Sequence, residues 1–155
     1  KMILYDKLRL INWHYFLNET VPISNITFLT GANGTGKSTI IDAMQIVLTG
    51  DPSGKNFNKA ASEKTGRTLK GYLYGETGED ADGNVKALRK GSFTSYVVLQ
   101  FKEDDGSHFT IGIYFDCSTL KGDDYQFFYI NSQNIVLLFL LKERMDLSPC
   151  LVKNL

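Results

Sequence analysis

The chain has 155 residues and a mass of 17.4 kDa, which is the size of one domain or of a part of a larger one. Hydrophobic residues make up 43% and charged residues 22%, so disorder, collagen and coiled coil are excluded as descriptions of the whole chain. The longest apolar run, Ile135 to Leu141, is too short to span a bilayer, and we expect no membrane partner. Because 17 basic residues balance 17 acidic ones, binding of nucleic acid over the whole surface is not expected.

The cysteines and the N-terminus indicate a compartment. Cys117 and Cys150 do not form a disulfide framework, and with the separated His14 and His108 they do not form a zinc site. The N-terminal residues run directly into charged side chains and resemble no secretion signal. We therefore expect a cytoplasmic protein in a reducing environment.

Three extended segments are expected before the first glycine-rich stretch. Residues Leu4 to Trp13 are typical of a strand, and three of its residues are core candidates: Leu8, Leu10 and Trp13. Thr20 to Ile23 is a short extended piece in which Pro22 indicates a sheet edge or a strand end. Asn25 to Thr30 is compact, apolar and rich in β-branched residues, which predicts a buried strand.

A glycine-rich turn and a helix follow. Gly31 to Gly36 form the turn, and Lys37 to Thr49 have the composition of a helix. Its polar residues form only a narrow stripe (Asp42, Gln45 and Thr49), so the helix is expected to be buried nearly all round. Gly50 with Asp51 and Pro52 is a stop signal.

The middle of the chain is a long polar excursion, Asp51 to Lys90, with a short element expected around Leu69 to Tyr74. Its first part is rich in basic residues (Lys55, Lys59, Lys64, Arg67 and Lys70), and the next is acidic (Glu76, Glu79, Asp80 and Asp82). These charges are either a basic loop beside an acidic one or two solvated loops.

The clearest β pattern comes next. Phe93 to Lys102 and Phe109 to Asp116 alternate between apolar and polar residues, with an acidic turn between them, which predicts an antiparallel hairpin. Asp124 to Ile130 is expected to be a third strand.

One motif carries chemistry. Gly31-Ala32-Asn33-Gly34-Thr35-Gly36-Lys37-Ser38 fits G-x-x-x-x-G-K-[ST] without mismatch, between an expected strand and a helix. Glycines allow backbone N–H groups to approach phosphate oxygens, and the helix N-terminus adds partial positive charge. We expect Lys37 to reach the β- and γ-phosphates, Ser38 to bind Mg²⁺ and Thr39 to donate to the α-phosphate. ATP and Mg²⁺ are the expected cofactors, and the expected nucleotide-binding residues are Gly31, Asn33, Gly34, Thr35, Gly36, Lys37, Ser38 and Thr39.

The sequence of this loop resembles that of the ABC-type ATPases, especially the SMC-like branch that includes condensins, MukB and repair ATPases. Ser38 to Gly50 is similar to the helix that follows the nucleotide loop in SMC heads, and Leu10 to Phe16 is similar to the aromatic segment that precedes it. With Gly66 to Leu73 and the Phe93 to Phe115 hairpin, the pattern looks closest to MukB-like condensin ATPases of Wadjet plasmid-defence systems (the JetC or MksB kind). The resemblance runs from about Leu8 to Asn131.

The resemblance implies further roles. His14 occupies the place where relatives put a basic residue near the nucleotide, and the alternative is an exposed loop histidine. Arg67 matches the arginine loop near nucleotide or DNA in SMC heads, and the alternative is a solvated surface arginine. The implied partners are the C-terminal half of the same head, a second head in a homodimer, DNA through the full complex and accessory subunits.

Parts needed for hydrolysis are missing from the sequence. ABC-type ATPases carry an apolar strand that ends in Asp-Glu, and the only lookalike, Ile113 to Asp116, is followed by Cys117. There is no Leu-Ser-Gly-Gly signature and no convincing glutamine loop. The chain is therefore interpreted as the N-terminal part of a split ATPase head, and no catalytic set is complete in it.

The expected fold class is α/β: a P-loop NTPase of ABC/SMC type, incomplete, with a mixed sheet and an antiparallel hairpin. Residues 1–133 would form the N-terminal lobe of the head, and residues 134–155 a divergent or truncated tail. Two other functions stay open: a repair ATPase of the same superfamily that acts with a nuclease, and a nucleotide-binding module that does not hydrolyse.

Overall fold

A computed structural model describes residues 2–57, 67–118, 124–132 and 153–154. The apolar run Ile135 to Leu141 and nearly all of the expected tail lie outside the described residues, as do Lys59 and Lys64 of the basic stretch.

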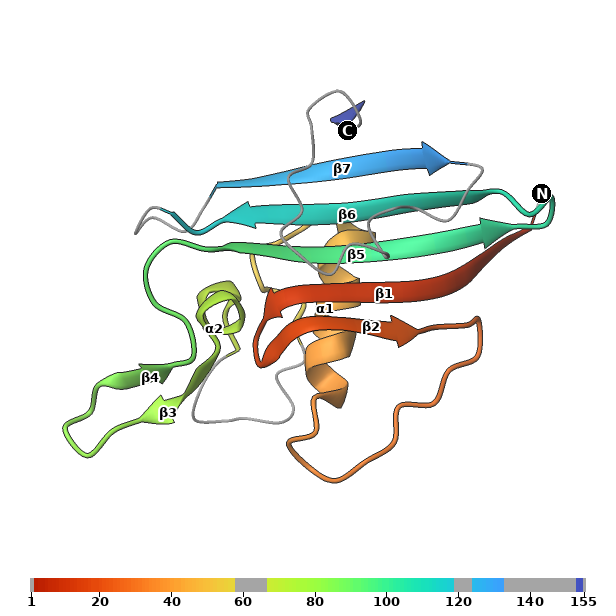
Figure 1. The fold of residues 1–155 in the computed structure, drawn as a ribbon. Helices are drawn as coiled ribbons and strands as arrows, with labels where there is room; N and C mark the ends of the chain where they lie inside the picture. Colours follow the sequence, from red (N-terminus) through yellow and green to blue (C-terminus); the bar gives the residue numbers. More distant parts are fainter. Residues whose placement is uncertain (1, 58–66, 119–123, 133–152, 155) are drawn as a thin grey trace.

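One antiparallel sheet dominates the molecule (Figure 1). Its six strands lie in the order β2-β1-β5-β6-β7-β8, and every neighbouring pair runs antiparallel. Their bounds are β1 Ile3–Trp13, β2 Phe16–Pro22, β5 Thr94–Glu103, β6 His108–Asp116, β7 Asp124–Ser132 and β8 Lys153–Asn154. The predicted first strand, the hairpin and the third strand after it are confirmed, and Pro22 ends the edge strand β2 as expected.

Helix α1, Lys37–Thr49, packs on one face of this sheet (Figure 1). The predicted bounds are confirmed, and Gly50 ends the helix in the left-handed conformation with its N–H bonded to the Ile46 carbonyl. The core lies between the helix and the sheet, and Leu8, Leu10 and Trp13 are fully buried in it, as predicted. Further core residues are Ile40, Ala43, Ile46 and Val47 of the helix and Val97, Leu99, Ile113 and Phe115 of the hairpin.

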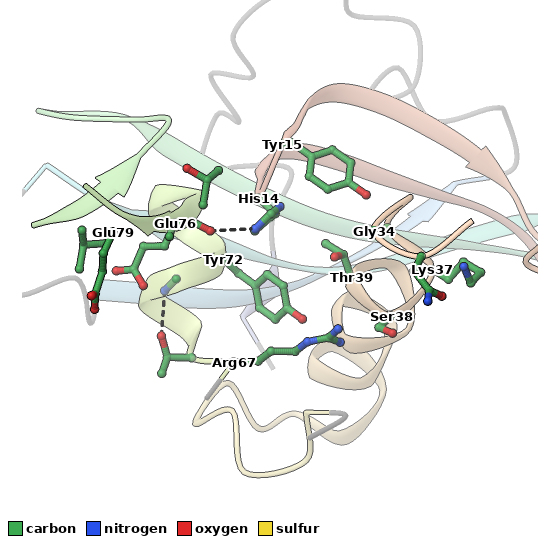
Figure 2. A pocket seen from close by; sticks show the side chains of 17 residues that line it. His14, Tyr15, Gly34, Lys37, Ser38, Thr39, Arg67, Tyr72, Glu76 and Glu79 are labelled. Atoms are coloured by element: carbon green, nitrogen blue, oxygen red, sulfur yellow. Dashed lines mark hydrogen bonds between the residues drawn. The ribbon is translucent and has the colours of Figure 1, made fainter. Parts of the chain in front are cut away.

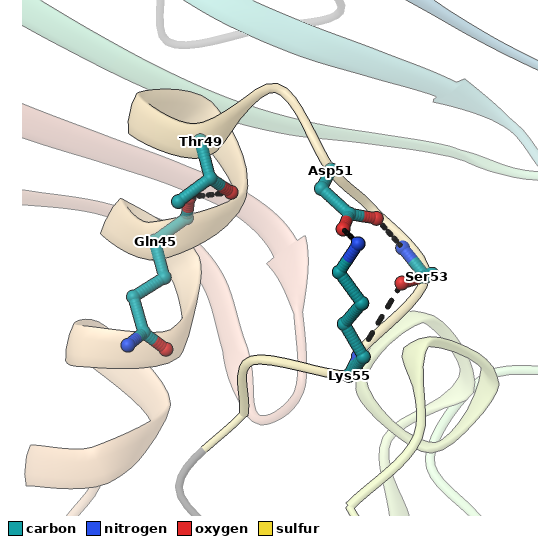
Figure 3. Close-up of polar contacts among 5 residues, drawn as sticks. All are labelled: Gln45, Thr49, Asp51, Ser53 and Lys55. Carbon is teal, nitrogen blue, oxygen red and sulfur yellow. Dashed lines mark hydrogen bonds and ion pairs between the residues drawn. The ribbon is translucent and has the colours of Figure 1, made fainter.

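The chain leaves α1 through a compact polar turn (Figure 3). The Asp51 carboxylate accepts from the Ser53 amide at 3.0 Å and pairs with the Lys55 ammonium at 2.6 Å. These contacts, the one with Lys55 first, lower the pKa of Asp51 to about 2. These contacts therefore fix the backbone at the start of the polar excursion that follows α1.

The described part of the excursion contains three short elements: α2 Leu69–Tyr74, β3 Glu76–Glu79 and β4 Val85–Ala87. The short element expected at Leu69 to Tyr74 is confirmed as a helix, and Thr68 caps it by accepting from the Gly71 amide. Strands β3 and β4 form a separate antiparallel ribbon beside it (Figure 1).

The prediction of a buried strand at Asn25 to Thr30 is wrong. This segment forms no strand, and Ile26 and Phe28 are 77% and 84% exposed. A strand of this composition needs neighbours on both sides, and no described strand pairs with it. Its backbone is instead bonded locally: the Ser24 hydroxyl donates to the Ile26 carbonyl, and the Ser24 amide donates to Thr27.

The expected burial of α1 is also wrong in part. Asp42, assigned to the polar stripe, is fully buried, whereas Ile41 and Leu48 are 42% and 47% exposed. The helix is packed on its Asp42 side because α2 and Arg67 reach it there. One apolar side consequently faces away from the core.

The expected mixed sheet is replaced by a wholly antiparallel one among the described strands, and the buried strand expected at residues 25–30 is not part of it. The alternation in β5 is incomplete as well: Tyr96 and Val98 on the second face are buried against Phe128. None of the helices in the described part of the chain is long and apolar enough to cross a membrane.

Candidate functional site

The glycine-rich loop wraps around the side chain of its own lysine. The Lys37 ammonium donates to the carbonyls of Gly31 and Ala32, both at 2.7 Å. The Thr35 hydroxyl closes the loop from within, donating to the Ala32 carbonyl at 2.9 Å. The loop thus has a fixed curvature, and the lysine lies inside it.

Gly36 is the position where the loop meets the turn between β1 and β2. Its φ is +94°, and a Cβ added there would lie 1.9 Å from the Tyr15 hydroxyl oxygen. No other residue fits this combination of backbone conformation and close approach. The motif glycine therefore lets the aromatic side chain lie directly against the start of α1.

Trp13 anchors the first turn of α1 to the end of β1. It is fully buried, its indole N–H donates to the Thr39 carbonyl at 3.2 Å, and its ring stacks on Tyr72 at 4.8 Å between centroids. Since a buried indole needs a partner for its N–H, this bond fixes the helix relative to the sheet.

A buried carboxylate joins α1 to α2. The Tyr72 hydroxyl donates to Asp42 at 2.5 Å, and the Arg67 guanidinium pairs with the same carboxylate oxygen at 3.2 Å. Burial, followed by the bond to Asp42, raises the pKa of Tyr72. Arg67 is thereby held beside the helix that carries Lys37 and Ser38 (Figure 2).

His14 lies in the turn between β1 and β2, with a left-handed φ of +48°. Its ring lies edge-on to Tyr15 and Tyr72, and its Nε2 is 3.2 Å from the Glu76 carbonyl. A carbonyl only accepts, so Nε2 carries the proton in this bond. Burial lowers the pKa of His14, which keeps the ring neutral at pH 7.

Arg89, just after β4, braces the turn and α2 from behind. Its guanidinium is buried and donates to three carbonyls, at 2.7 Å for Leu73, 2.5 Å for His14 and 3.2 Å for Tyr72. Because carbonyls at the ends of elements need donors, a single buried cation here satisfies several at once. The turn that carries His14 and the ribbon β3–β4 are thus joined to one support.

These elements line an open pocket of about 1310 Å³ (Figure 2). Of the sequence-predicted site residues, the structure brings eight to its wall: His14, Asn33, Gly34, Gly36, Lys37, Ser38, Thr39 and Arg67. Gly31 and Thr35 do not line it but shape the loop from within. Residues about 50 apart in sequence, His14 and Arg67, therefore share a cavity with the phosphate-loop motif.

Asp116, the lookalike for a metal-side aspartate, is not part of this pocket. It ends β6, and its carboxylate accepts from the Ser118 amide at 2.9 Å. The Ser118 hydroxyl, followed by this amide, lowers the pKa of Asp116, as in an ordinary turn.

Sequence reasoning missed several pocket residues and supports. Tyr15, Tyr72, Glu76 and Glu79 line the wall, while Asp42 and Arg89 act from behind it. One signal was available: Asp42 stands in a helix that is apolar on both sides of its narrow polar stripe. A carboxylate in such a helix indicates a buried partner rather than solvent.

Comparison with known families matches residues 5–64 to the P-loop containing region of AAA domain. The match covers β1 from Tyr5 onward, β2, the phosphate loop and α1. It supports a P-loop ATPase segment, and such a region indicates nucleotide binding.

Proposed function

We propose that this chain is the ATP-binding, N-terminal part of an SMC-like ATPase head that works in a DNA-organising or DNA-defence complex. The observation that carries the nucleotide-binding part of this proposal is the pocket itself. Lys37 and Ser38 at the start of α1 share it with Arg67, His14 and Tyr15, which come from two other segments. The SMC-like identity rests on the resemblance of the loop, helix and preceding aromatic segment.

The contacts of the loop support binding of a nucleoside triphosphate. Lys37 already satisfies two carbonyl acceptors, Gly31 and Ala32, and a phosphate would offer it stronger ones in the same place. The N-terminus of α1 adds unpaired amides and partial positive charge. Ser38 lies on the pocket wall, where its hydroxyl would hold Mg²⁺, and the metal would neutralise charge on the phosphates.

The exposed apolar surface supports an incomplete head. Ile26 and Phe28 before the loop, with Ile41 and Leu48 on the outer side of α1, present large side chains to solvent. Surface of this kind is expected where another part of a protein packs. We propose that the C-terminal half of the head covers it, that two heads then close over nucleotide, and that DNA and accessory subunits bind the full cytoplasmic complex.

One observation favours a second candidate, a module that binds nucleotide without hydrolysing it. The only acidic side chains among the described pocket-lining residues, Glu76 and Glu79, lie across the pocket from Ser38. A carboxylate that orients the attacking water must lie near the metal and the γ-phosphate. A repair ATPase of the same superfamily is the remaining alternative, and no feature of the pocket favours it.

Turnover separates these functions. The 155-residue chain alone should show negligible ATP hydrolysis, because positioning and electrostatics supply nearly all catalysis in phosphoryl transfer. A C-terminal half-head added in trans should restore hydrolysis, and Lys37→Ala or Ser38→Ala should abolish it again. Robust Lys37-dependent hydrolysis by the chain alone would contradict the split-head proposal, whereas binding that no added half-head converts to hydrolysis would favour the second candidate.

A further inference from the structure

Helix α1 carries a fully buried carboxylate, that of Asp42. Asp42 follows Ser38 by four residues, and side chains at this spacing lie on the same face of a helix. Because Cβ atoms tilt toward the N-terminus of a helix, the carboxylate is directed toward the turn that begins with Lys37. The buried charge is therefore next to the first turn of α1, whose residues line the pocket.

Stability alone gives no reason for a charge at this position. A buried carboxylate costs free energy of desolvation, and replacing a buried ion pair with apolar side chains is often neutral or stabilising. The nearby helix residues Ala43 and Ile46 are apolar and buried. A carboxylate in such surroundings points to a role for the group with which it pairs.

The cation that pairs with Asp42 reaches the pocket. Arg67 Nη1 lies 3.2 Å from Asp42 Oδ2, and the Arg67 side chain is 22% exposed and lines the pocket. Figure 2 shows this side chain extending from the segment before α2 toward α1. A guanidinium carries several N–H donors in a fixed fork, so pairing at one nitrogen leaves others for a second anion. Arg67 can therefore bind an anion in the pocket while it stays paired with Asp42.

The carboxylate itself is held from α2. The Tyr72 hydroxyl donates to the same Asp42 oxygen at 2.5 Å, and the Tyr72 ring is buried and stacked on Trp13. An arginine loses side-chain conformational entropy when it binds a ligand. Holding the side chain in place beforehand reduces this cost, so the network of Tyr72, Asp42 and Arg67 favours binding by preorganisation.

We propose that Asp42 is a positioning residue for phosphate binding: it holds Arg67 so that the guanidinium joins Lys37 on the phosphates of a bound nucleotide. One cation is then fixed by the loop carbonyls and the other by the buried carboxylate. A carboxylate that withheld Arg67 from the phosphates would act in the opposite direction, and its removal would strengthen binding. This inference rests on the proposed binding of nucleotide at the loop.

The test is a double-mutant cycle on the binding of ATP with Mg²⁺, measured by titration calorimetry on the full 155-residue chain. Arg67→Gln should weaken binding about tenfold, because a charged contact to phosphate is lost. Asp42→Asn, which keeps an acceptor for Tyr72, should weaken it about fivefold. The double variant should bind no more weakly than Arg67→Gln, because Asp42 acts through Arg67. Lys70→Gln, on an exposed side chain of α2 that does not line the pocket, should leave the affinity unchanged.

Three results overturn the proposal. Asp42 has only a structural role if its substitution weakens binding by the same factor with and without Arg67. It withholds Arg67 if Asp42→Asn binds ATP more tightly than wild type. An unchanged affinity in either single variant contradicts the proposal as well.

Should Asp42→Asn not fold, Arg67→Lys serves instead. An ammonium on a shorter fork-free side chain lacks the geometry to pair with Asp42 and phosphate together, so this variant should bind ATP as weakly as Arg67→Gln. Binding as tight as that of wild type would show that charge alone matters and would overturn the inference. Failure of the underlying proposal looks different, because wild type and Lys37→Ala would then bind ATP equally.

Discussion

The sheet and the segment before the phosphate loop are built from similar residues, but they differ in strand pairing and in the burial of their side chains. Strands β5, β6 and β7 pair along their full lengths, and Val97, Leu99 and Phe115 are fully buried. Residues 25–30 are equally apolar, yet Ile26 and Phe28 face solvent. Burial therefore depends on whether a partner strand is present, and composition alone does not decide it.

The difference lies in whether a partner strand is present among the described residues. Strands β5 to β7 pair through successive hairpins, and β5 also pairs with β1 from the start of the chain. The segment at residues 25–30 has no such neighbour among the described residues. Under the split-head proposal, the missing half of the head would cover this segment beside the phosphate loop.

Trp13→Ala should produce the largest loss on the sheet side of this comparison. The substitution removes a fully buried ring, its stack on Tyr72 and its bond to the Thr39 carbonyl. We expect the free energy of unfolding to fall by about 3–5 kcal/mol in urea titration. A loss below about 1 kcal/mol would show that the sheet and α1 are not joined through this residue.

Tyr72→Phe should have a smaller effect, between α1 and α2. It leaves the buried Asp42 carboxylate with Arg67 and without its hydroxyl donor, so we expect a loss of about 1–3 kcal/mol. Tyr74→Phe on the same helix is the matched control, since Tyr74 contributes a ring contact to Phe93, and it should cost less than about 0.5 kcal/mol. Equal losses in the two variants would contradict the role given to Asp42.

His14→Asn tests the turn between β1 and β2 through the pH dependence of the free energy of unfolding. Burial lowers the pKa of His14, so the unfolded chain, which titrates near 6.5, binds a proton before the folded chain does. Wild type should therefore lose stability as the pH falls below about 6.5. Asn tolerates the left-handed backbone, and the difference in unfolding free energy between wild type and variant should narrow from pH 7 to pH 5. A difference that stays constant or widens would contradict burial of a neutral ring.

Phe28→Ser should have the smallest effect on stability, under about 0.5 kcal/mol, because the side chain is 84% exposed. Its effect should appear in association instead: light scattering at high concentration should show less self-association than wild type. Leu88→Ser, which removes another exposed apolar side chain (54%) away from this segment, is the control. If Phe28→Ser destabilises the chain strongly, the segment is already packed within it.

The sequence predicted what depends on local pattern. The hairpin, the bounds of α1, the short helix α2 and the core positions Leu8, Leu10 and Trp13 all follow from periodicity and stop signals. The motif predicted the loop, and the resemblance pointed to His14 and Arg67, which do lie in the pocket. Whether those two residues bind nucleotide stays a prediction.

What the sequence did not predict depends on long-range contact. Asp42 reads as a surface residue until Tyr72 and Arg67, some 30 residues later, are placed on it. Arg89 bonds to carbonyls up to 75 residues away, and no local sequence pattern predicts these contacts. The acidic stretch in β3 was predicted only as charge, because its position beside the pocket depends on the bond between the His14 ring and the Glu76 carbonyl.

The central claim is that the loop between residues 31 and 38 binds a nucleotide. The most direct measurement is titration calorimetry of the chain with ATP and Mg²⁺, for wild type and Lys37→Ala. Lys37 is the cation inside the loop, and among the described residues it bonds to the Gly31 and Ala32 carbonyls, so its loss should weaken binding at least tenfold while the fold is retained. Equal affinity in the two proteins, or no binding by wild type, would contradict the account.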